Sequence, residues 1–309
     1  MKLLRKINLL REFGIKVFMA DLLASNIRIP KLTARWKDKV FTSWLREHYQ
    51  HILNKYLLMN TTTEHDNSSS YVWSMWWQGD NNLPEVIQLC FGNIKRHCGD
   101  HKFIVISKDN YRDYITLPDY ILKKVNDGSI TLTHLSDIIR MYLLSHYGGL
   151  WIDATILVTD DIPEKVFSEN FFTLKRTCNT SLYNVSMNRW AGNLMAAKKG
   201  NILCSFCLDV FLEFWKSHSM LIDYVFIDYV IAWAYLDISE CTDMINSVQE
   251  GNFAFDDLQP LLNSVWQQEK YNALMKNTHF FKLTYKHTFK KDIHGKETFY
   301  GYIIKNLWP

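Results

Sequence analysis

The chain has 309 residues, and 48% of them are hydrophobic, which is enough to fill the core of one large domain or two modest ones. Lysine and arginine number 35 against 32 acidic residues, so a net charge of +3 argues against a nucleic-acid-binding protein as a whole. Aromatic residues reach 15%, a content common in proteins that stack on sugar or base rings. Composition therefore favours a globular chain over a disordered one.

The six cysteines follow no metal or disulfide spacing, which is typical of reduced thiols in a cytoplasmic protein. Cys204 and Cys207 form a single CxxC within an apolar stretch, where they would lie one helical turn apart and pack. We therefore predict neither a zinc site nor a disulfide framework. The cysteines are Cys90, Cys98, Cys178, Cys204, Cys207 and Cys241.

Residues 1–60 are predicted to form a basic, amphipathic helical extension in which Pro30 interrupts the helical pattern. Residues 1–40 contain ten Lys or Arg and three acidic residues, a net charge of +7. These charges interrupt the early apolar residues, so no signal peptide and no run of about 20 apolar residues is present. One interpretation is a tether to an anionic membrane surface, and the other is a surface helix that packs on the main domain. We expect a cytoplasmic protein, either soluble or peripheral on the inner face of the cell membrane.

Residues 61–70 are polar and lack apolar periodicity, which predicts a linker. The aromatic run 71–79 then predicts a buried strand, 84–98 a helix and 101–107 a second strand. A β-α-β order indicates an α/β domain with a mostly parallel sheet over residues 71–309.

Residues 136–149, SDIIRMYLLSHYGG, combine signals for the start and the end of a helix. Ser136 is the predicted N-cap, Asp137 lies in the predicted first turn, and Gly148-Gly149 ends the helix. Because Asp137 and Arg140 are three residues apart, we expect them on one face of the helix.

Residues 150–158, LWIDATILV, alternate as one predicted strand with Trp151, Asp153 and Thr155 on the same side. A carboxylate in so apolar a strand needs a partner, because an unpaired buried charge is costly. A metal ion or substrate bound at the end of the strand would supply it. A purely structural ion pair between Asp153 and Arg140 is the alternative.

With these features the chain resembles the capsular polysaccharide synthesis glycosyltransferases, which are related to glycosyltransferase family 32 and its DxD sugar-binding region. The resemblance covers about residues 71–290, with weaker matches at 221–229 and 282–287, and leaves the N-terminal helices outside. The matching residues are Trp73, Trp76, Trp77, Gln78, Gly79, Ser136, Asp137, Arg140, Tyr147, Gly148, Gly149, Trp151, Asp153, Ala154 and Thr155.

This resemblance implies a GT-A fold, a Rossmann-like sheet that binds a nucleotide-sugar, most often a UDP-sugar, through a Mn²⁺ or Mg²⁺ ion. It also implies that the donor contacts lie on the first strand, the helix face and the start of the next strand. The implied donor-binding residues are Trp77, Gln78, Gly79, Asp137, Arg140, Gly149, Trp151 and Asp153.

The motif Asp153-Ala154-Thr155 departs from the family pattern, because Thr155 stands where a second acid is expected. Asp153 and Thr155 are the implied metal ligands, since a divalent ion often uses one carboxylate together with substrate phosphates and water. Either the ion arrives with the nucleotide, or cationic side chains partly replace it.

The implied reaction is retaining hexosyl transfer to a glycan or lipid-linked acceptor in bacterial capsular or other surface polysaccharide synthesis. Negative charge grows on the leaving diphosphate, and we expect Lys286 and His287 to meet it, unless they belong to a solvated charged segment.

Two further carboxylates, Asp223 and Asp228, are candidates to face the acceptor hydroxyl or the sugar, or else to pair within a helix hairpin. Asn193 follows a predicted strand at 184–187 and is a candidate neighbour of the donor sugar, although most loop asparagines only shape a turn. The competing interpretation of the whole chain is a degenerate, nucleotide-sugar-binding scaffold that lacks catalysis because of Thr155. Nucleic acid is not an expected partner.

Overall fold

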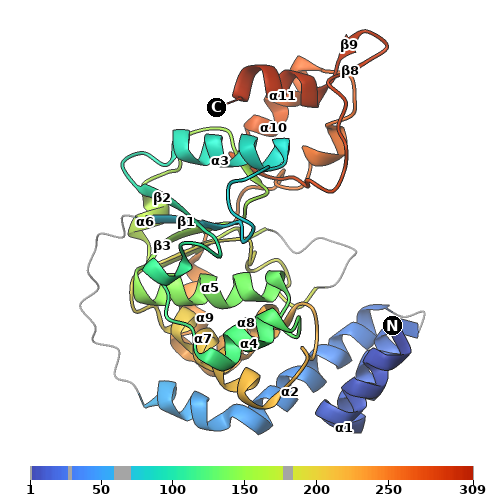
Figure 1. The fold of residues 1–309 in the computed structure, drawn as a ribbon, viewed down its shortest axis with the longest axis vertical. Helices are drawn as coiled ribbons and strands as arrows, with labels where there is room; N and C mark the ends of the chain where they lie inside the picture. Colours follow the sequence, from blue (N-terminus) through green and yellow to red (C-terminus); the bar gives the residue numbers. More distant parts are fainter. Residues whose placement is uncertain (1, 27–29, 59–70, 177–183, 309) are drawn as a thin grey trace.

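The computed structural model describes residues 2–26, 30–58, 71–176 and 184–308 (Figure 1). The predicted linker 61–70 and Cys178 lie outside the described residues.

The centre of the molecule is a five-stranded sheet in the order β2-β1-β3-β6-β5. β1 is parallel to both β2 and β3, whereas β6 is antiparallel to β3 and to β5, so four of the five strands run in one direction. The prediction of an α/β fold with a mostly parallel sheet is confirmed. The strands are β1 (Tyr71–Met75), β2 (Lys102–Ile106), β3 (Gly149–Ile152), β5 (Phe171–Thr173) and β6 (Leu194–Ala197).

Helices cover both faces of this sheet (Figure 1). Trp73 and Trp151 point into the core shared with the larger group of helices, whereas Val72 and Leu150 point towards α3, as the alternation of a strand requires. On the α3 side lie α3 (Glu85–His97) and the short α6 (Lys165–Ser168). The larger group comprises α4 (Asp119–Asn126), α5 (Leu132–His146), α7 (Ile202–Ser217), α8 (Phe226–Asp237) and α9 (Ser239–Ser247).

The N-terminal extension is a hairpin of α1 (Lys2–Asn26) and α2 (Pro30–Leu57) that packs against α7 and α8. Phe13 and Phe41 are buried in the same core as the larger helix group. Arg46 Nε and Nη2 each donate a 2.7 Å hydrogen bond to the Asp237 carboxylate of α8. One side of the predicted amphipathic extension is therefore part of the folded core. No helix within the described ranges has the length and apolar character to cross a bilayer.

The C-terminal region forms a second, smaller layer, shown at the top of Figure 1. β4 (Ile156–Val158) pairs antiparallel with β7 (Phe280–Lys282), which ties the centre of the sequence to its C-terminal part. Helices α10 (Gln268–Met275) and α11 (Phe299–Leu307) form a third hydrophobic cluster with one side of α3. The short strands β8 (Asp292–Ile293) and β9 (Lys296–Glu297) pair antiparallel with each other outside this cluster.

The predicted helix start at Ser136 is wrong. α5 begins at Leu132, where the Thr131 hydroxyl accepts the N-cap hydrogen bond, and Ser136 Oγ instead donates to a backbone carbonyl within the helix. Asp137 consequently lies in the second turn of α5, away from the unpaired N–H groups of the first turn.

The single strand predicted over 150–158 is also wrong. The chain turns after β3, and the Ile156 N–H donates to the Asp153 carbonyl at 3.0 Å before β4 joins β7 in a different sheet. Residues 184–187, predicted as a strand, form a turn, so Asn193 precedes strand β6 and follows no strand at that position.

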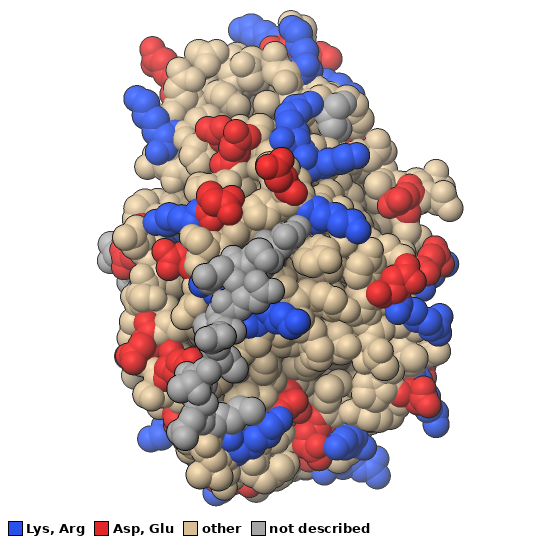
Figure 2. Space-filling view, turned by 90° about the vertical axis from the view of Figure 1, so that its left-hand side faces the viewer, with Lys and Arg blue, Asp and Glu red and all other residues tan. Residues whose placement is uncertain are grey.

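Cys204 and Cys207 are fully buried on α7, which confirms that they pack in the core. Burial raises the pKa of the Cys204 thiol to about 12. On the face shown in Figure 2, basic and acidic side chains are interspersed, in keeping with the small net charge.

Candidate functional site

The candidate site lies where the parallel strands β2, β1 and β3 end at a common edge of the sheet, the position at which α/β folds form ligand crevices. Gly148 and Gly149 lie at the other end of β3, where this strand begins beside β1. Both have positive φ, at 69° and 103°, which glycine adopts readily. A Cβ at Gly149 would lie 2.4 Å from the Tyr71 carbonyl oxygen of β1. Gly149, predicted to bind the donor, therefore has a structural role, because it lets β3 begin close against β1.

Asp153 follows β3 directly and is linked to the helix face through Arg140. Arg140 Nη1 donates to Asp137 Oδ1 at 3.0 Å, and its Nη2 donates to Asp153 Oδ1 at 3.2 Å. The Arg140 side chain is only 4% exposed, and its guanidinium lies 5.0 Å from the centre of the Trp151 ring. Trp151 Nε1 adds a 2.9 Å hydrogen bond to Asp153 Oδ1. The structure thus brings together four of the predicted site residues.

Lys282 is a candidate site residue that the sequence did not single out. Its Nζ lies 3.3 Å from Asp153 Oδ2, because β7 pairs with β4 directly beyond the turn at Asp153. We refer to Asp137, Arg140, Asp153 and Lys282 as the ion-pair chain. Lys282 opens the segment 282–287 that matched the family pattern, so its position was a signal, but the basic residues predicted from that segment were Lys286 and His287.

His134 extends the ion-pair chain into the protein. Its Nδ1 lies 3.3 Å from Asp137 Oδ2, and its side chain is 2% exposed. The i, i+3 spacing from His134 to Asp137 and from Asp137 to Arg140 places all three on one face of α5. The buried end of the ion-pair chain is therefore held by contacts along one face of α5, whereas Lys282, 30% exposed, lies at the open end.

Asp228 lies in the first turn of α8, and its Oδ1 accepts a 2.8 Å hydrogen bond from Trp190 Nε1. Burial raises the pKa of this carboxyl to about 6, the Trp190 hydrogen bond opposes the rise, and Asp137 and Arg140 also act on it electrostatically. A carboxylate with such a pKa is ionised at neutral pH and is basic enough to accept a proton from a hydroxyl.

Asn193 lies beside Asp153, whose backbone N–H donates to the Asn193 carbonyl at 2.9 Å. Within the described part of the chain, Asn193 Oδ1 is buried and has no hydrogen-bond partner. A buried acceptor without a donor is costly, so this oxygen is suited to a ligand hydroxyl or amide. The neighbouring Gly192 keeps the loop close to Arg140, since a Cβ there would lie 3.4 Å from Arg140 Nη1.

Residues after β1 line the same edge of the sheet. Trp77 is half-buried against the Tyr111 ring at 5.3 Å, Gln78 is exposed, and Gly79 takes the positive φ of 79° that the turn requires. The Trp76 ring lies 5.2 Å from Tyr285, which brings the end of β1 next to the segment that follows Lys282.

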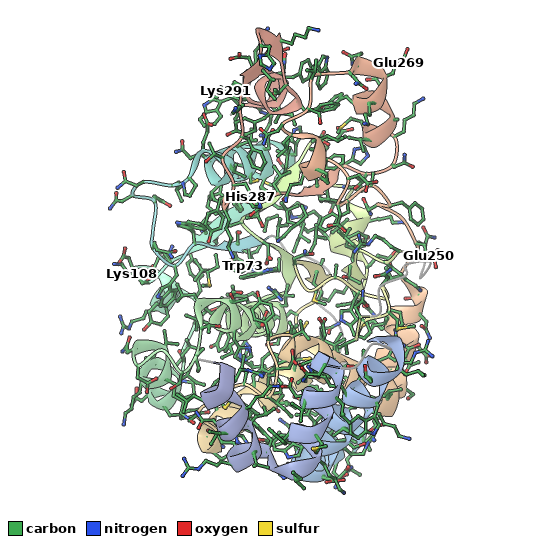
Figure 3. The ribbon with its side chains drawn as sticks, turned by 90° about the vertical axis from the view of Figure 1, so that its right-hand side faces the viewer. Trp73, Lys108, Glu250, Glu269, His287 and Lys291 are labelled. Atoms are coloured by element: carbon green, nitrogen blue, oxygen red, sulfur yellow. The ribbon has the colours of Figure 1, made fainter. Side chains whose placement is uncertain are left out.

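Asp223 lies away from the ion-pair chain, whereas Lys286 and His287 directly follow Tyr285. Asp223 forms an ion pair with Lys37 of α2, at the contact with the N-terminal hairpin. Lys286 and His287 are exposed, and in Figure 3 His287 lies between Trp73 in the central sheet and Lys291 in the C-terminal region. Both lie at the end of the segment 282–287, but Lys282, at its start, is the residue that reaches the Asp153 carboxylate.

The residues around Asp153 do not fit a resident divalent metal ion. Both carboxylate oxygens already accept from cationic groups, and a metal ion there would have to displace Lys282 and lie beside Arg140. Thr155, on the same turn, offers one half-buried hydroxyl. Across the described ranges, no three His, Cys, Asp or Glu side chains are grouped so that they could hold a metal.

Comparisons with known proteins identify relatives of the chain. The O-glycosyltransferase braB of Annulohypoxylon truncatum is 26% identical over 167 residues, which are 48% of this chain and 38% of that protein. The chain therefore spans less than half the length of this relative. Among solved structures, the PaToxG glycosyltransferase superposes with a TM-score of 0.38 at 14% identity, covering 71% of this chain and 84% of that one.

The family model described as capsular polysaccharide synthesis protein matches residues 24–303. The match begins near the end of α1, so the family pattern includes α2, which lay outside the expected range of 71–290. Kinship with glycosyltransferase family 32 and a DxD motif stay predictions. Because the matched residues make up most of the sequence, the chain belongs to the capsular polysaccharide synthesis protein family.

Proposed function

We propose that the protein is a nucleotide-sugar-dependent glycosyltransferase with a GT-A-type site. It transfers a hexosyl group, with retention, from a UDP-sugar to a glycan or lipid-linked acceptor in the synthesis of a capsular or other surface polysaccharide. The observation that carries the proposal is the ion-pair chain at the carboxyl edge of the parallel strands. Family membership and the glycosyltransferase name of the fungal relative support it.

The bond that breaks joins the anomeric carbon of the donor sugar to a phosphate oxygen, and the bond that forms joins this carbon to the acceptor oxygen. Negative charge grows on the diphosphate, so a fixed cation near it lowers the barrier. Lys282 is suited to this role because it is the accessible end of the ion-pair chain, while Arg140 holds Asp153 in place. In a retaining, front-face reaction the departing phosphate oxygen takes the proton of the acceptor hydroxyl.

Other side chains are suited to position the donor. Trp77 and Gln78, at the end of β1, are placed for the base and ribose, and the buried Asn193 Oδ1 is available to a sugar hydroxyl. Asp228 is ionised at neutral pH, with a pKa of about 6, and can accept a hydrogen bond from the sugar or the acceptor.

A Mn²⁺ or Mg²⁺ ion that arrives on the donor phosphates is the alternative source of positive charge, with Asp153 and Thr155 as its ligands. The existing contacts of the Asp153 carboxylate favour Lys282 instead. If Lys282 supplies the charge, addition of a chelator leaves donor binding and turnover close to their untreated values, whereas loss of both with the chelator supports the ion.

The first experiment is a thermal-shift panel of uridine, guanosine and cytidine diphosphate sugars, each with and without Mn²⁺. A true donor raises Tm by mass action, with about 2.7 kcal/mol of stabilisation at a hundredfold excess over Kd. Slow hydrolysis of that donor, measured as released nucleotide, then reports turnover. If none of these donors binds, the proposed function is wrong.

Substitution of the site tests its position. Asp153→Ala is expected to abolish turnover and leave the protein folded, while Asp160→Ala, at an exposed carboxylate seven residues further on, retains it. Equal activity of the two variants would show that the site lies elsewhere.

The second candidate function is a nucleotide-sugar-binding scaffold without catalysis. The specific observation in its favour is Thr155 in place of a second acid, together with an Asp153 carboxylate already neutralised by two cations. This candidate predicts donor binding with no nucleotide release under any metal condition, so the hydrolysis measurement separates it from the enzyme.

A further inference from the structure

We propose that the α1–α2 hairpin docks the protein on the surface of a membrane that contains anionic lipids. Seven of the sixteen large hydrophobic side chains that are exposed among the described residues lie between residues 4 and 36. This concentration is notable because the opposite side of the same hairpin is already packed on α7 and α8. The seven are Leu4, Ile7, Leu10, Ile15, Met19, Leu32 and Trp36.

The start of α2 shows how these side chains are arranged. Leu32, Arg35, Trp36 and Lys39 are all exposed, and their spacing of three, four and seven residues places them on one face of the helix. Leu32 is 63% exposed and Trp36 is 41% exposed. A tryptophan with leucine and flanking basic residues is the composition of a helix that lies in the lipid interface, because the ring bridges the apolar and polar layers.

The acidic side chains of the hairpin contact other residues of the protein. Each of the three acids in the first 40 residues has a partner inside the protein. Glu12 accepts from the Ser219 backbone N–H, Asp21 pairs with Lys37, and Asp38 accepts from the Tyr229 hydroxyl.

Several basic side chains of the hairpin, by contrast, face solvent. Arg11, Lys16 and Lys39 are exposed, as are the apolar side chains beside them. Residues 1–40 carry a net charge of +7, and the acids that would offset it are turned towards the protein. Such a surface is complementary to anionic headgroups, for which each basic residue contributes about a fivefold gain in binding.

Two hollows border the hairpin and match the two parts of a lipid. A hollow of about 660 Å³ beside the first turns of α1 is lined by Leu4, Met220, Leu221 and Tyr224. A second hollow of about 340 Å³ beside α2 is lined by four basic residues and one acid, although Arg46 is paired with Asp237. These residues are Arg35, Asp38, Lys39 and Arg46 from α2 and Arg189 from the loop before β6. The first hollow is mostly apolar, and the second carries a net positive charge.

The hairpin lies at one end of the molecule, opposite α10 and α11 (Figure 1). None of the described helices could span a bilayer, so the hairpin would lie in the interface with its apolar side chains in the headgroup layer. This proposal does not depend on the proposed function, because it concerns a surface that is remote from Asp153 along the fold.

The test is co-sedimentation of the full chain with vesicles of phosphatidylcholine, with and without phosphatidylserine. Binding is expected only to the vesicles that contain phosphatidylserine, and high salt should weaken it because the Debye length shortens. Equal binding to both vesicle types, or binding to neither, would overturn the proposal.

Two pairs of variants separate the charge from the apolar contribution. Removing two exposed charges with Arg11→Gln and Lys16→Gln is expected to lower the partition into anionic vesicles roughly twentyfold. The matched control, Lys270→Gln on α10 with Lys276→Gln at its end, removes two exposed charges at the opposite end of the molecule and should change it little.

Ile15→Ser and Trp36→Ser remove two exposed apolar side chains and should lower binding at least tenfold, whereas Phe253→Ser, which removes an equally exposed ring elsewhere, should not. Circular dichroism and Tm confirm that each variant is folded. If Ile15→Ser and Trp36→Ser instead convert a dimer to a monomer without changing vesicle binding, the face is an interface between two copies and the proposal is wrong.

Discussion

Replacement of Asp228 by asparagine should make the protein more stable and less active at neutral pH. The buried Asp228 carboxyl has a pKa of about 6, compared with an ordinary value of 3.8, mainly because burial disfavours its charged form. The folded state therefore binds this proton more tightly than the unfolded state. It follows that stability falls as pH rises from about 4 through 6, where the folded protein must ionise a buried group.

The size of the effect follows from the shift of about two pKa units. At 1.36 kcal/mol per unit, the ionised carboxylate costs about 3 kcal/mol near pH 7.5 and about 1.6 kcal/mol near pH 5. Asparagine keeps an oxygen that can accept the Trp190 N–H and carries no charge. Asp228→Asn is thus expected to raise Tm by roughly 5 °C near pH 7.5, with about half that gain near pH 5.

Thermal unfolding of the wild type and the variant, followed by circular dichroism at the two pH values, measures this difference. Asp243→Asn, at an exposed carboxylate of α9, is the control and should show no gain at either pH. A gain of equal size at both pH values, or a loss of stability near neutrality, would refute the role of burial. Donor turnover in Asp228→Asn is expected to fall by about 10² to 10⁴ if the carboxylate accepts a proton or positions a hydroxyl.

Two further substitutions test the ion-pair chain and the double glycine. Lys282→Gln should lower turnover about 10² to 10³-fold, whereas Lys286→Gln, at an exposed residue four positions later, should keep turnover close to wild type. A larger loss of turnover in Lys286→Gln than in Lys282→Gln would show that Lys286 stabilises the phosphate charge. Gly149→Ala should lower the free energy of unfolding by at least about 2 kcal/mol, because its Cβ would meet the Tyr71 carbonyl in a left-handed backbone. Gly200→Ala, which also has positive φ but open space around it, should cost only about 1 kcal/mol, and urea denaturation compares the two.

Local sequence determined the features that depend on near neighbours. Asp137 and Arg140 share a helix face because they are three residues apart, and the double glycine follows the end of that helix because glycine takes up positive φ without steric cost. The β-α-β order of residues 71–107 likewise followed from apolar periodicity and was confirmed. The Ser136 cap was wrong because Thr131, with an equally suitable hydroxyl, caps the helix one turn earlier.

Only the tertiary structure decided which side chains complete the site. Lys282 reaches Asp153 across 129 residues of sequence because β7 pairs with β4, and strand pairing at that distance leaves no periodic signal. The chain also leaves the central sheet after β3, because β4 pairs with β7 in a separate two-stranded sheet. The burial of Asp228 next to Trp190 depends on how α8 packs. Asp223, five residues earlier, instead contacts Lys37 of the N-terminal hairpin. The sequence thus supplied the carboxylate and its helix partner, whereas long-range packing supplied the cation, the buried Asp228 carboxyl and the two faces of the N-terminal hairpin.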